Sequence, residues 1–331
     1  MTSKERVYET LSFSAPDRIP VDIWVLPAAY DKYGQQLIDL IDQRNIDFAL
    51  VPILDPTADP LAYETGFHYD VWGCGWQNHQ KGIIGEVKEW PLADDKAVDS
   101  YKSPVNLLRG CKDFYTGTYE YLSKVKDKFN LCGWVSLFER MQYLRGTENL
   151  YVDIALESDE FFKIRDMVME YWCVYIEMVC KIEEIDAVTI GDDWGSQRSL
   201  LISPESWRNL FKPCYKQLID LIRSYGKKAF IHSDGNILEI YDDWIELGVS
   251  AINSQVWCMG IENVAQKCAG KITLWGEVDR QHILPVLSPE EVVQKIGYMK
   301  ENFYKNGGLI GQFETGRDVS LENIKAALYA W

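Results

Sequence analysis

The second half of the chain alternates short apolar runs with long helical patterns, and this alternation limits the possible fold more than any other feature. Five strands are expected, over residues 186–195, 228–235, 249–257, 271–279 and 308–316. A helical pattern follows each of them, and one helix is expected over 203–226. Ser203-Pro204 and Ser288-Pro289 mark helix starts, because Ser is a preferred N-cap and Pro fits the first helical turn. Alternating strands and helices of these lengths predict a parallel sheet.

The first half supplies three further expected strands, over 19–24, 47–55 and 131–141, with a long helix over 107–129 before the third. Between the second and third strands, residues 60–92 are predicted to form an inserted β-hairpin with its turn around Gly82. An N-terminal helix over 3–13 is expected to cover the bottom of the sheet. Eight strands predict an α/β fold of one domain over 1–331, a single (β/α)8 TIM barrel. A doubly wound open sheet is the alternative, because the insertion interrupts the rhythm.

The composition excludes several classes of partner. Among 331 residues, 34 Lys and Arg stand against 50 Asp and Glu, which gives a net charge of −16. Nucleic acids and anionic membranes are bound through clustered basic residues, so neither is expected as a partner. No apolar run approaches the ~18 residues of a membrane helix, and the first residues lack the apolar core of a signal peptide. A cytoplasmic protein with reduced cysteines is expected.

Polar residues at the expected strand ends are the candidates for function, because barrel enzymes carry their reactive groups there. Most of these ends are acidic, and their carboxylates would repel one another unless a cation, shared protons or basic substrate groups offset them. His232 is the only histidine at an expected strand end, and Asp234 two residues later projects to the same face. With Glu277 and Glu314 on neighbouring strands, they predict a mononuclear metal site. A histidine fixed by an aspartate, or a turn at Asp234, is the alternative.

Other strand-end residues are expected to act on the substrate. Only one of Asp192 and Asp193 can face the mouth, because successive strand residues point to opposite sides. Either is a candidate proton donor beside His232. The expected substrate-binding residues are Trp24, Glu139, Arg140, Trp194, Gln197, Asn253 and Gln255. The chain holds 12 Trp, 19 Tyr and 12 Phe, and several tryptophans fall at strand ends or in the insertion. A ring-lined pocket for a flat ligand is one interpretation, and ordinary core packing is the other.

Several segments together resemble the uroporphyrinogen decarboxylase superfamily. They are PDRIPV (16–21), FERMQYLRG (138–146), GDDWGSQ (191–197) with ISPESWRNLFKP after it, HSDGNI (232–237), WGEVDRQHILP (275–285) and LENI (321–324). The resemblance implies a (β/α)8 barrel and one of two chemistries. True uroporphyrinogen decarboxylases grip the substrate's carboxylates with an arginine-rich stretch near the first strand. The corresponding residues 21–33 contain no arginine, so this chemistry is not expected.

The other branch comprises zinc methyltransferases that exchange methyl groups with a corrinoid protein. His232 matches the histidine of the His-x-Cys ligand pair in the enzymes acting on coenzyme M, Asp234 replaces the cysteine, and Glu314 lies near the position of their second cysteine. Carboxylates are harder ligands than thiolates and suit the activation of an oxygen. The resemblance therefore implies a corrinoid-dependent O-demethylase with Zn²⁺, acting on a small methoxylated, aromatic methyl donor.

The methyl group would pass to the cob(I)alamin of a separate corrinoid protein, because the chain has no D-x-H-x-x-G signature of its own. A metal-free decarboxylase that protonates its product through His232 and an aspartate is the alternative enzyme. A non-enzymatic scaffold for a corrinoid protein is a third hypothesis. A homodimer is an assembly that the sequence leaves open.

Overall fold

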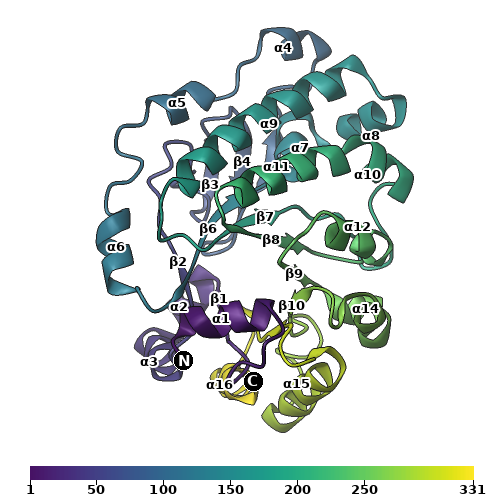
Figure 1. Ribbon diagram of the computed structural model, residues 1–331. Coiled ribbons are helices and arrows are strands. Elements are labelled where there is room, and N and C mark those ends of the chain that lie inside the picture. Colours follow the sequence, from purple (N-terminus) through teal and green to yellow (C-terminus); the bar gives the residue numbers. More distant parts are fainter.

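The computed structural model describes residues 1–331, and its centre is a curled parallel sheet (Figure 1). Seven strands pair in the order β11-β10-β9-β8-β7-β6-β2, and every neighbouring pair is parallel. Their bounds are β2 (Phe48–Leu50), β6 (Phe129–Val135), β7 (Ala187–Gly191), β8 (Lys228–Ser233), β9 (Ala251–Ser254), β10 (Thr273–Trp275) and β11 (Leu309–Ile310). This order follows the chain without reversal, which is the order of a barrel and not of a doubly wound sheet.

The first and last barrel strands are short and irregular, and they complete the barrel. β1 (Trp24–Val25) pairs in parallel with β12 (Glu314–Thr315), and Val21 forms a bridge to Gly311. On the other side, the Asp47 amide donates to the carbonyl of Val21 at 3.0 Å. The predicted TIM-type (β/α)8 fold is therefore confirmed.

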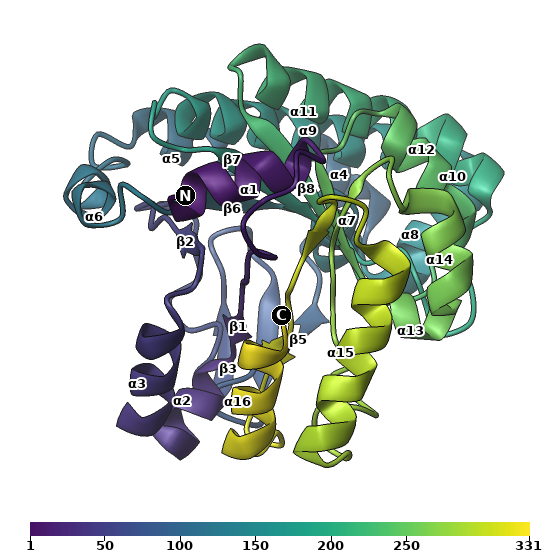
Figure 2. The same cartoon turned by 60° about the horizontal axis from the view of Figure 1, so that its bottom comes forward.

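Helices surround the sheet, and the C-terminal α16 packs beside α15 and α3 (Figure 2). The helices are α1 (Ser3–Leu11), α2 (Pro27–Tyr33), α3 (Gln35–Arg44), α4 (Asp95–Ser100), α5 (Val105–Gly110), α6 (Thr118–Lys124), α7 (Phe138–Arg145), α8 (Thr147–Leu156), α9 (Asp159–Cys180), α10 (Pro204–Leu210), α11 (Lys212–Ser224), α12 (Tyr241–Glu246), α13 (Val256–Met259), α14 (Ile261–Cys268), α15 (Pro289–Phe303) and α16 (Leu321–Ala330), with a 3₁₀ turn η1 (Leu238–Ile240). None of them combines the length and the apolar character that a bilayer-crossing helix requires.

The inserted segment is larger than the expected hairpin. β3 (Gly66–Tyr69), β4 (Gly75–Asn78) and β5 (Glu86–Glu89) form a three-stranded antiparallel sheet in the order β3-β4-β5. Gly82 lies in the connection between β4 and β5, as predicted. The additional strand β3 is only four residues long, so the alternation of Phe67 and Tyr69 with Gly66 and His68 was too short to predict it, and both rings are exposed.

Three expected elements have different limits. The third strand ends at Val135, and residues 138–141 begin α7. The helix expected over 203–226 is two helices, because Pro213 has no amide proton for a continuous helix and lies instead at the start of α11. The long helix expected over 107–129 is replaced by the short helices α5 and α6.

The interior of the barrel is filled by aromatic side chains. Phe48, Phe129, Phe230 and Trp275 pack against one another there, with ring centroids 5.2–6.5 Å apart. Val7 of α1 belongs to the same cluster, so the N-terminal helix closes the bottom of the barrel as predicted. Part of the aromatic surplus is therefore core packing, and Trp275 is fully buried there.

Candidate functional site

Three polar side chains meet where β7 and β8 end. Asp193 follows β7, His232 lies within β8, and Asp234 follows β8. The Nε2 atom of His232 is 3.5 Å from Oδ1 of Asp193 and 3.6 Å from Oδ1 of Asp234. One ligand atom from each residue lies within 4.8 Å of the others, which is a spacing that can hold a metal ion. The candidate metal cluster thus contains Asp193, which the sequence analysis had assigned to catalysis alone.

Two glycines bring the aspartates together. The loops after β7 and β8 cross at Gly195 and Gly235, where a Cβ on Gly235 would lie 2.0 Å from the Gly195 carbonyl oxygen. Gly235 also has a φ of +76°, a conformation that other residues rarely adopt. The crossing allows the Asp234 amide to donate to Oδ1 of Asp193 at 2.8 Å. The glycines of the sequences GDDWG and HSDG therefore position the carboxylates.

The orientation of His232 is set by Asn253 on β9. The Asn253 amide group donates to the carbonyl of Trp275 at 2.7 Å and to Oε1 of Gln312 at 2.9 Å, so its oxygen is left to accept a hydrogen bond. That oxygen lies 2.6 Å from Nδ1 of His232. Nδ1 therefore carries a proton, and Nε2 of the neutral ring offers its lone pair to the cluster. This is the outer-shell arrangement that orients metal-binding histidines. Asn253, predicted to bind substrate, instead holds His232.

Without a cation, the charges of this cluster favour a protonated His232. Burial disfavours the charged ring, but the hydrogen bond and charge of Asp193, with the charges of Asp234 and Glu277, raise the pKa of His232 to about 9. Although burial raises the pKa of Asp193, the hydrogen bond and charge of His232 lower it overall. Asp193 is therefore an ionised carboxylate and not a proton donor.

Arg280 separates the remaining predicted metal ligands from the cluster. Its guanidinium pairs with Oε1 of Glu314 at 2.8 Å, contacts Oδ2 of Asp234, and lies 3.6 Å from Oε1 of Glu277. Glu277 and Glu314 therefore lie beside Arg280 and not within the Asp193–His232–Asp234 group. Sequence reasoning missed Arg280 because it lies in the loop after β10, beyond the expected strand end. Its spacing of three residues from Glu277 was the only signal.

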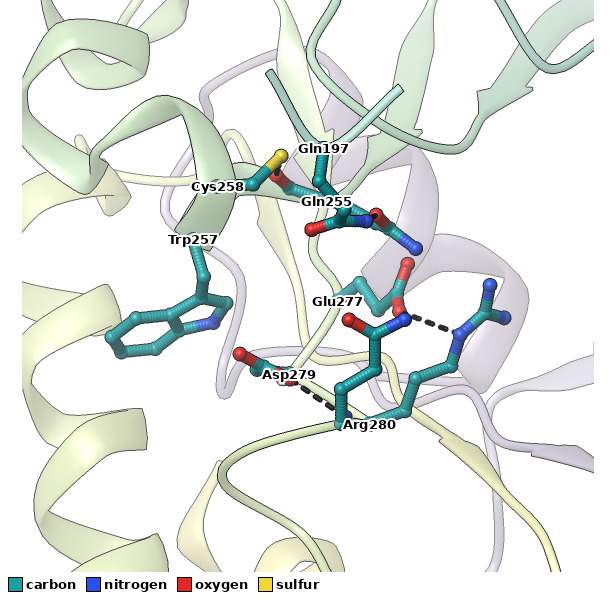
Figure 3. A pocket seen from close by; sticks show the side chains of 8 residues that line it. Gln197, Gln255, Trp257, Cys258, Glu277, Asp279 and Arg280 are labelled. Atoms are coloured by element: carbon teal, nitrogen blue, oxygen red, sulfur yellow. Dashed lines mark hydrogen bonds and ion pairs between the residues drawn. The ribbon is translucent and has the colours of Figure 1, made fainter. Parts of the chain in front are cut away.

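Glu277 is a buried carboxyl group without hydrogen-bond partners. Its side chain is 3% exposed and neither oxygen has a partner. Burial, followed by the charge of Asp234, raises its pKa to about 8, so it is protonated at neutral pH. Figure 3 shows it near Arg280 in a small cavity that Gln197 and Gln255 also line. The cavity of about 20 Å³ has room for about one water molecule.

Two predicted site residues point away from the mouth. Asp192 is buried and accepts hydrogen bonds from the amides of Leu137 and Glu139 at 2.8 and 2.9 Å and from the Tyr215 hydroxyl at 2.7 Å. Trp194 is fully buried and stacks on Phe138, with ring centroids 4.0 Å apart. Asp192 therefore anchors the loop before α7, and Trp194 packs between the barrel and its outer helices.

An aromatic cavity lies next to the metal-binding cluster. Trp134, at the end of β6, has its ring centroid 5.2 Å from that of His232, and Trp24 lies at the same distance from His232. Trp134 also lines a cavity that includes Glu139 and Arg140, two of the predicted substrate-binding residues. The cavity continues to the insertion, whose contributions are Asp70, Trp72, Trp76 and Ile84. The insertion therefore forms one wall of a pocket whose Trp134 also packs against His232.

The donor set fits a zinc ion. Asp193, His232 and Asp234 supply three ligand atoms, and catalytic zinc sites have three protein ligands with a fourth position open. Oδ1 of Asp234 is buried and has no hydrogen-bond partner, whereas its Oδ2 faces Arg280. A buried carboxylate oxygen without a hydrogen-bond partner, beside an imidazole nitrogen that faces two carboxylates, is the condition that a bound cation satisfies.

Comparison with models of protein families shows which family the chain belongs to. The model of the family described as uroporphyrinogen decarboxylase (URO-D) matches residues 70–328. The chain belongs to this family. The match covers most of the barrel and includes β4 and β5 of the insertion, β7, β8 and the loop that carries Arg280. None of the curated proteins compared with the chain is similar enough in sequence to count as a match.

One solved structure shares the fold of this URO-D family member over its full length. A methyltransferase from Methanosarcina mazei superposes with a TM-score of 0.73 at 15% identity, covering 100% of this chain and 98% of the other. A xylanase from Gloeophyllum trabeum reaches a TM-score of 0.46 at 12% identity, covering 93% and 87%. The first of these likenesses extends over the whole barrel and its insertion.

Proposed function

We propose that this URO-D family protein is a corrinoid-dependent methyltransferase of the O-demethylase type. It would take the methyl group of a small methoxylated aromatic substrate and pass it to the cob(I)alamin of a separate corrinoid protein. The observation that carries the proposal is the Asp193–His232–Asp234 group, in which Nε2 of His232 faces both carboxylates, next to Trp134 of the aromatic cavity. The full-length likeness to a methyltransferase supports it.

Asp193, His232 and Asp234 would hold Zn²⁺. When bound, zinc supplies a Lewis acid to the ether oxygen of the substrate. The chain's own residues prepare this site: Asn253 keeps the proton on Nδ1 of His232, and Arg280 occupies Oδ2 of Asp234 so that Oδ1 faces the cluster. The residue types support oxygen activation, because carboxylates and imidazole make a harder ligand set than thiolates.

Glu139 is placed to supply a proton to the leaving oxygen. Burial, followed by the charges of Asp193 and Asp192, raises its pKa to about 8, so it carries a proton at neutral pH. It lines the aromatic cavity and accepts a hydrogen bond from the Tyr143 hydroxyl at 3.2 Å. Asp193 is ionised and Asp192 is committed to the loop amides, so the proton-donor role proposed for them from the sequence passes to Glu139.

The proposal is tested by metal content and by methyl transfer. Purified protein should contain about one zinc per chain, and a methoxyphenol with free cob(I)alamin should give methylcobalamin, followed by its absorption spectrum. Asp193→Asn should lower both. The proposal is wrong if the zinc-loaded protein transfers no methyl group from any methoxylated ring, with free cob(I)alamin or with a corrinoid protein encoded beside it.

A metal-free decarboxylase is the second candidate, and one observation favours it. Without a cation, the two aspartates raise the pKa of His232 to about 9, and a protonated imidazole can donate a proton to a carbanion. This enzyme would release CO₂ in the presence of a chelator and would need no corrinoid. Measuring CO₂ release and methyl transfer on the same preparation separates the two functions.

A further inference from the structure

The aromatic cavity has the size of one substituted benzene ring. Its volume is about 230 Å³, and an apolar cavity of about 150 Å³ is already enough for benzene. A four-ring macrocycle would not fit inside it. The cavity is bounded by the insertion on one side and by β6 and α7 on the other, and it extends towards His232 through Trp134.

The walls of this cavity favour a flat ligand. Its aromatic lining consists of Trp72, Trp76, Trp134, Tyr143 and Trp172. These rings are held in place by their own contacts: Trp72 packs edge-on against Tyr171, Trp76 packs against Tyr143, and Nε1 of Trp172 donates to the Ser136 carbonyl at 2.6 Å. Preformed aromatic walls bind a ring with little loss of side-chain freedom.

The only cation in the lining is already neutralised. Arg140 pairs with Oδ2 of Asp70 at 3.3 Å, and its guanidinium lies over the rings of Trp72 and Tyr143 at 4.8 and 5.5 Å. Asp70 is itself fixed to the insertion, because the amides of Trp72 and Cys74 donate to it at 2.9 and 2.8 Å. Arg140 therefore joins α7 to the insertion, and Asp70 already balances its charge.

The acids of the lining exceed the cations. Asp55 has no ion-pair partner and accepts hydrogen bonds only from Thr57, at 2.8 and 2.9 Å, and weakly from Tyr171. Glu139 also lines the cavity, but its raised pKa of about 8 leaves it uncharged at neutral pH. A ligand carboxylate would thus meet the Asp55 carboxylate, which has no cation beside it, and an unpaired buried anion is strongly disfavoured. A hydroxyl group, in contrast, can donate a hydrogen bond to Asp55.

We propose that this cavity binds a single uncharged benzene ring that bears methoxy and hydroxyl groups, and that it rejects rings bearing a carboxylate. This inference rests on the proposed function and narrows its substrate class. The lining supplies aromatic walls for the ring, an acceptor for its hydroxyl group, and no cation for an acid. The ring's methoxy oxygen would face the end of the cavity that Trp134 shares with His232.

Two ligands of nearly equal shape test the proposal. 4-Hydroxy-3-methoxybenzamide and 4-hydroxy-3-methoxybenzoate differ by one charge at pH 7, and calorimetry on the wild-type protein measures both affinities. The amide should bind at least about 10-fold more tightly, the order expected for placing an unpaired anion in a buried pocket. Equal binding, tighter binding of the benzoate, or no binding of the amide and of 2-methoxyphenol at millimolar concentration would overturn the proposal.

Asp55→Asn sharpens the test, because it removes one negative charge and leaves the shape nearly unchanged. The preference for the amide over the benzoate should fall several-fold in this variant. Asp220→Asn, which makes the same charge change on the exposed face of α11, should leave the preference as in the wild type. Circular dichroism checks that both variants fold, and an unchanged preference in folded Asp55→Asn would contradict the role given to Asp55.

The outcome separates this inference from the proposed function. Ring binding with the expected preference, but without methyl transfer to cob(I)alamin, would support the pocket and refute the methyltransferase. Methyl transfer from a methoxybenzoate as fast as from a methoxyphenol would support the methyltransferase and refute the charge selection.

Discussion

At the bottom of the barrel Asp47 is completely buried, and both of its oxygens are fully used. Oδ1 accepts from Arg6 at 2.7 Å and from Arg18 at 2.9 Å, and Oδ2 accepts from Arg18 at 2.7 Å and from the Val21 amide at 2.8 Å. At the top, Glu277 is buried almost as deeply, but neither of its oxygens accepts a hydrogen bond, and its only ion pair is the long one of 3.6 Å to Arg280. At the bottom, the protein itself satisfies the hydrogen bonds and the charge of the buried carboxylate. At the top, a buried carboxyl group needs a bound ligand or a proton to satisfy it.

The largest effect is expected from His232→Ala at the top. It removes the imidazole whose Nε2 faces both aspartates, so methyl transfer should fall at least about 1,000-fold, because a Lewis acid at the reacting oxygen contributes several kcal/mol. The thermal midpoint should change little. The absorbance of methylcobalamin measures the rate, and His282→Ala, an exposed histidine, is the control. A variant with wild-type rate would show that the cluster is not the reactive centre.

The matching change at the bottom is Asp47→Ala. It leaves two arginines and one buried amide without their acceptor, so the free energy of unfolding should fall by about 3–5 kcal/mol. Denaturant unfolding measures the loss, with Asp39→Ala on the exposed face of α3 as the control. The zinc content of the folded fraction should not change. If the zinc content fell while the free energy of unfolding stayed unchanged, the bottom and the top of the barrel would not have separate roles.

A smaller effect is expected from Asn253→Ala, which leaves the ligands in place and removes the acceptor at Nδ1 of His232. Zinc affinity should drop about 10- to 100-fold, as when other outer-shell partners of metal-bound histidines are removed. Competition with a chromophoric chelator measures it, and Asn209→Ala on exposed α10 is the control. Unchanged affinity would mean that Nδ1 needs no partner to keep Nε2 free.

The smallest effect concerns stability against pH. The pKa of Glu277 is about 8 in the folded protein, above its ordinary value, so the folded state binds the proton more tightly than the unfolded chain. Its contribution to stability is present at low pH and is lost as pH rises from about 4.5 through 8. Glu277→Gln should remove this loss, so the variant should be more stable than the wild type at pH 8, with both proteins in chelator. If the free energy of unfolding varied with pH in the same way in both proteins, the raised pKa assigned to Glu277 would be wrong.

Most of the barrel could be predicted from the sequence because local patterns specify it. Ser203 and Ser288 cap α10 and α15 as expected, each accepting a hydrogen bond from an amide three residues later. The apolar runs before them became β7 and β10. Some helix limits were predicted wrongly because a competing local rule acted, as where Pro213 divides a helix. β3 was missed because it is short and its two aromatic rings remain exposed.

The candidate site could be predicted only in part. His232 and Asp234 were found because their spacing on a strand end is visible in the sequence. Asp193 and Asp192 could not be told apart, since only the twist of the loop after β7 decides which one faces His232. Trp194 was misplaced for the same reason, and its ring packs against Phe138 outside the barrel.

By itself, the sequence determined which residues stand at the strand ends and how acidic the barrel mouth is. Only the tertiary structure decided which of these acids are neutralised. Arg280 reaches Asp234 and Glu314 from a loop more than 30 residues away in the chain, and Arg140 is neutralised by Asp70 of the insertion. The pairing of long side chains across loops depends on how the loops pack, and no periodicity or spacing in the chain encodes it.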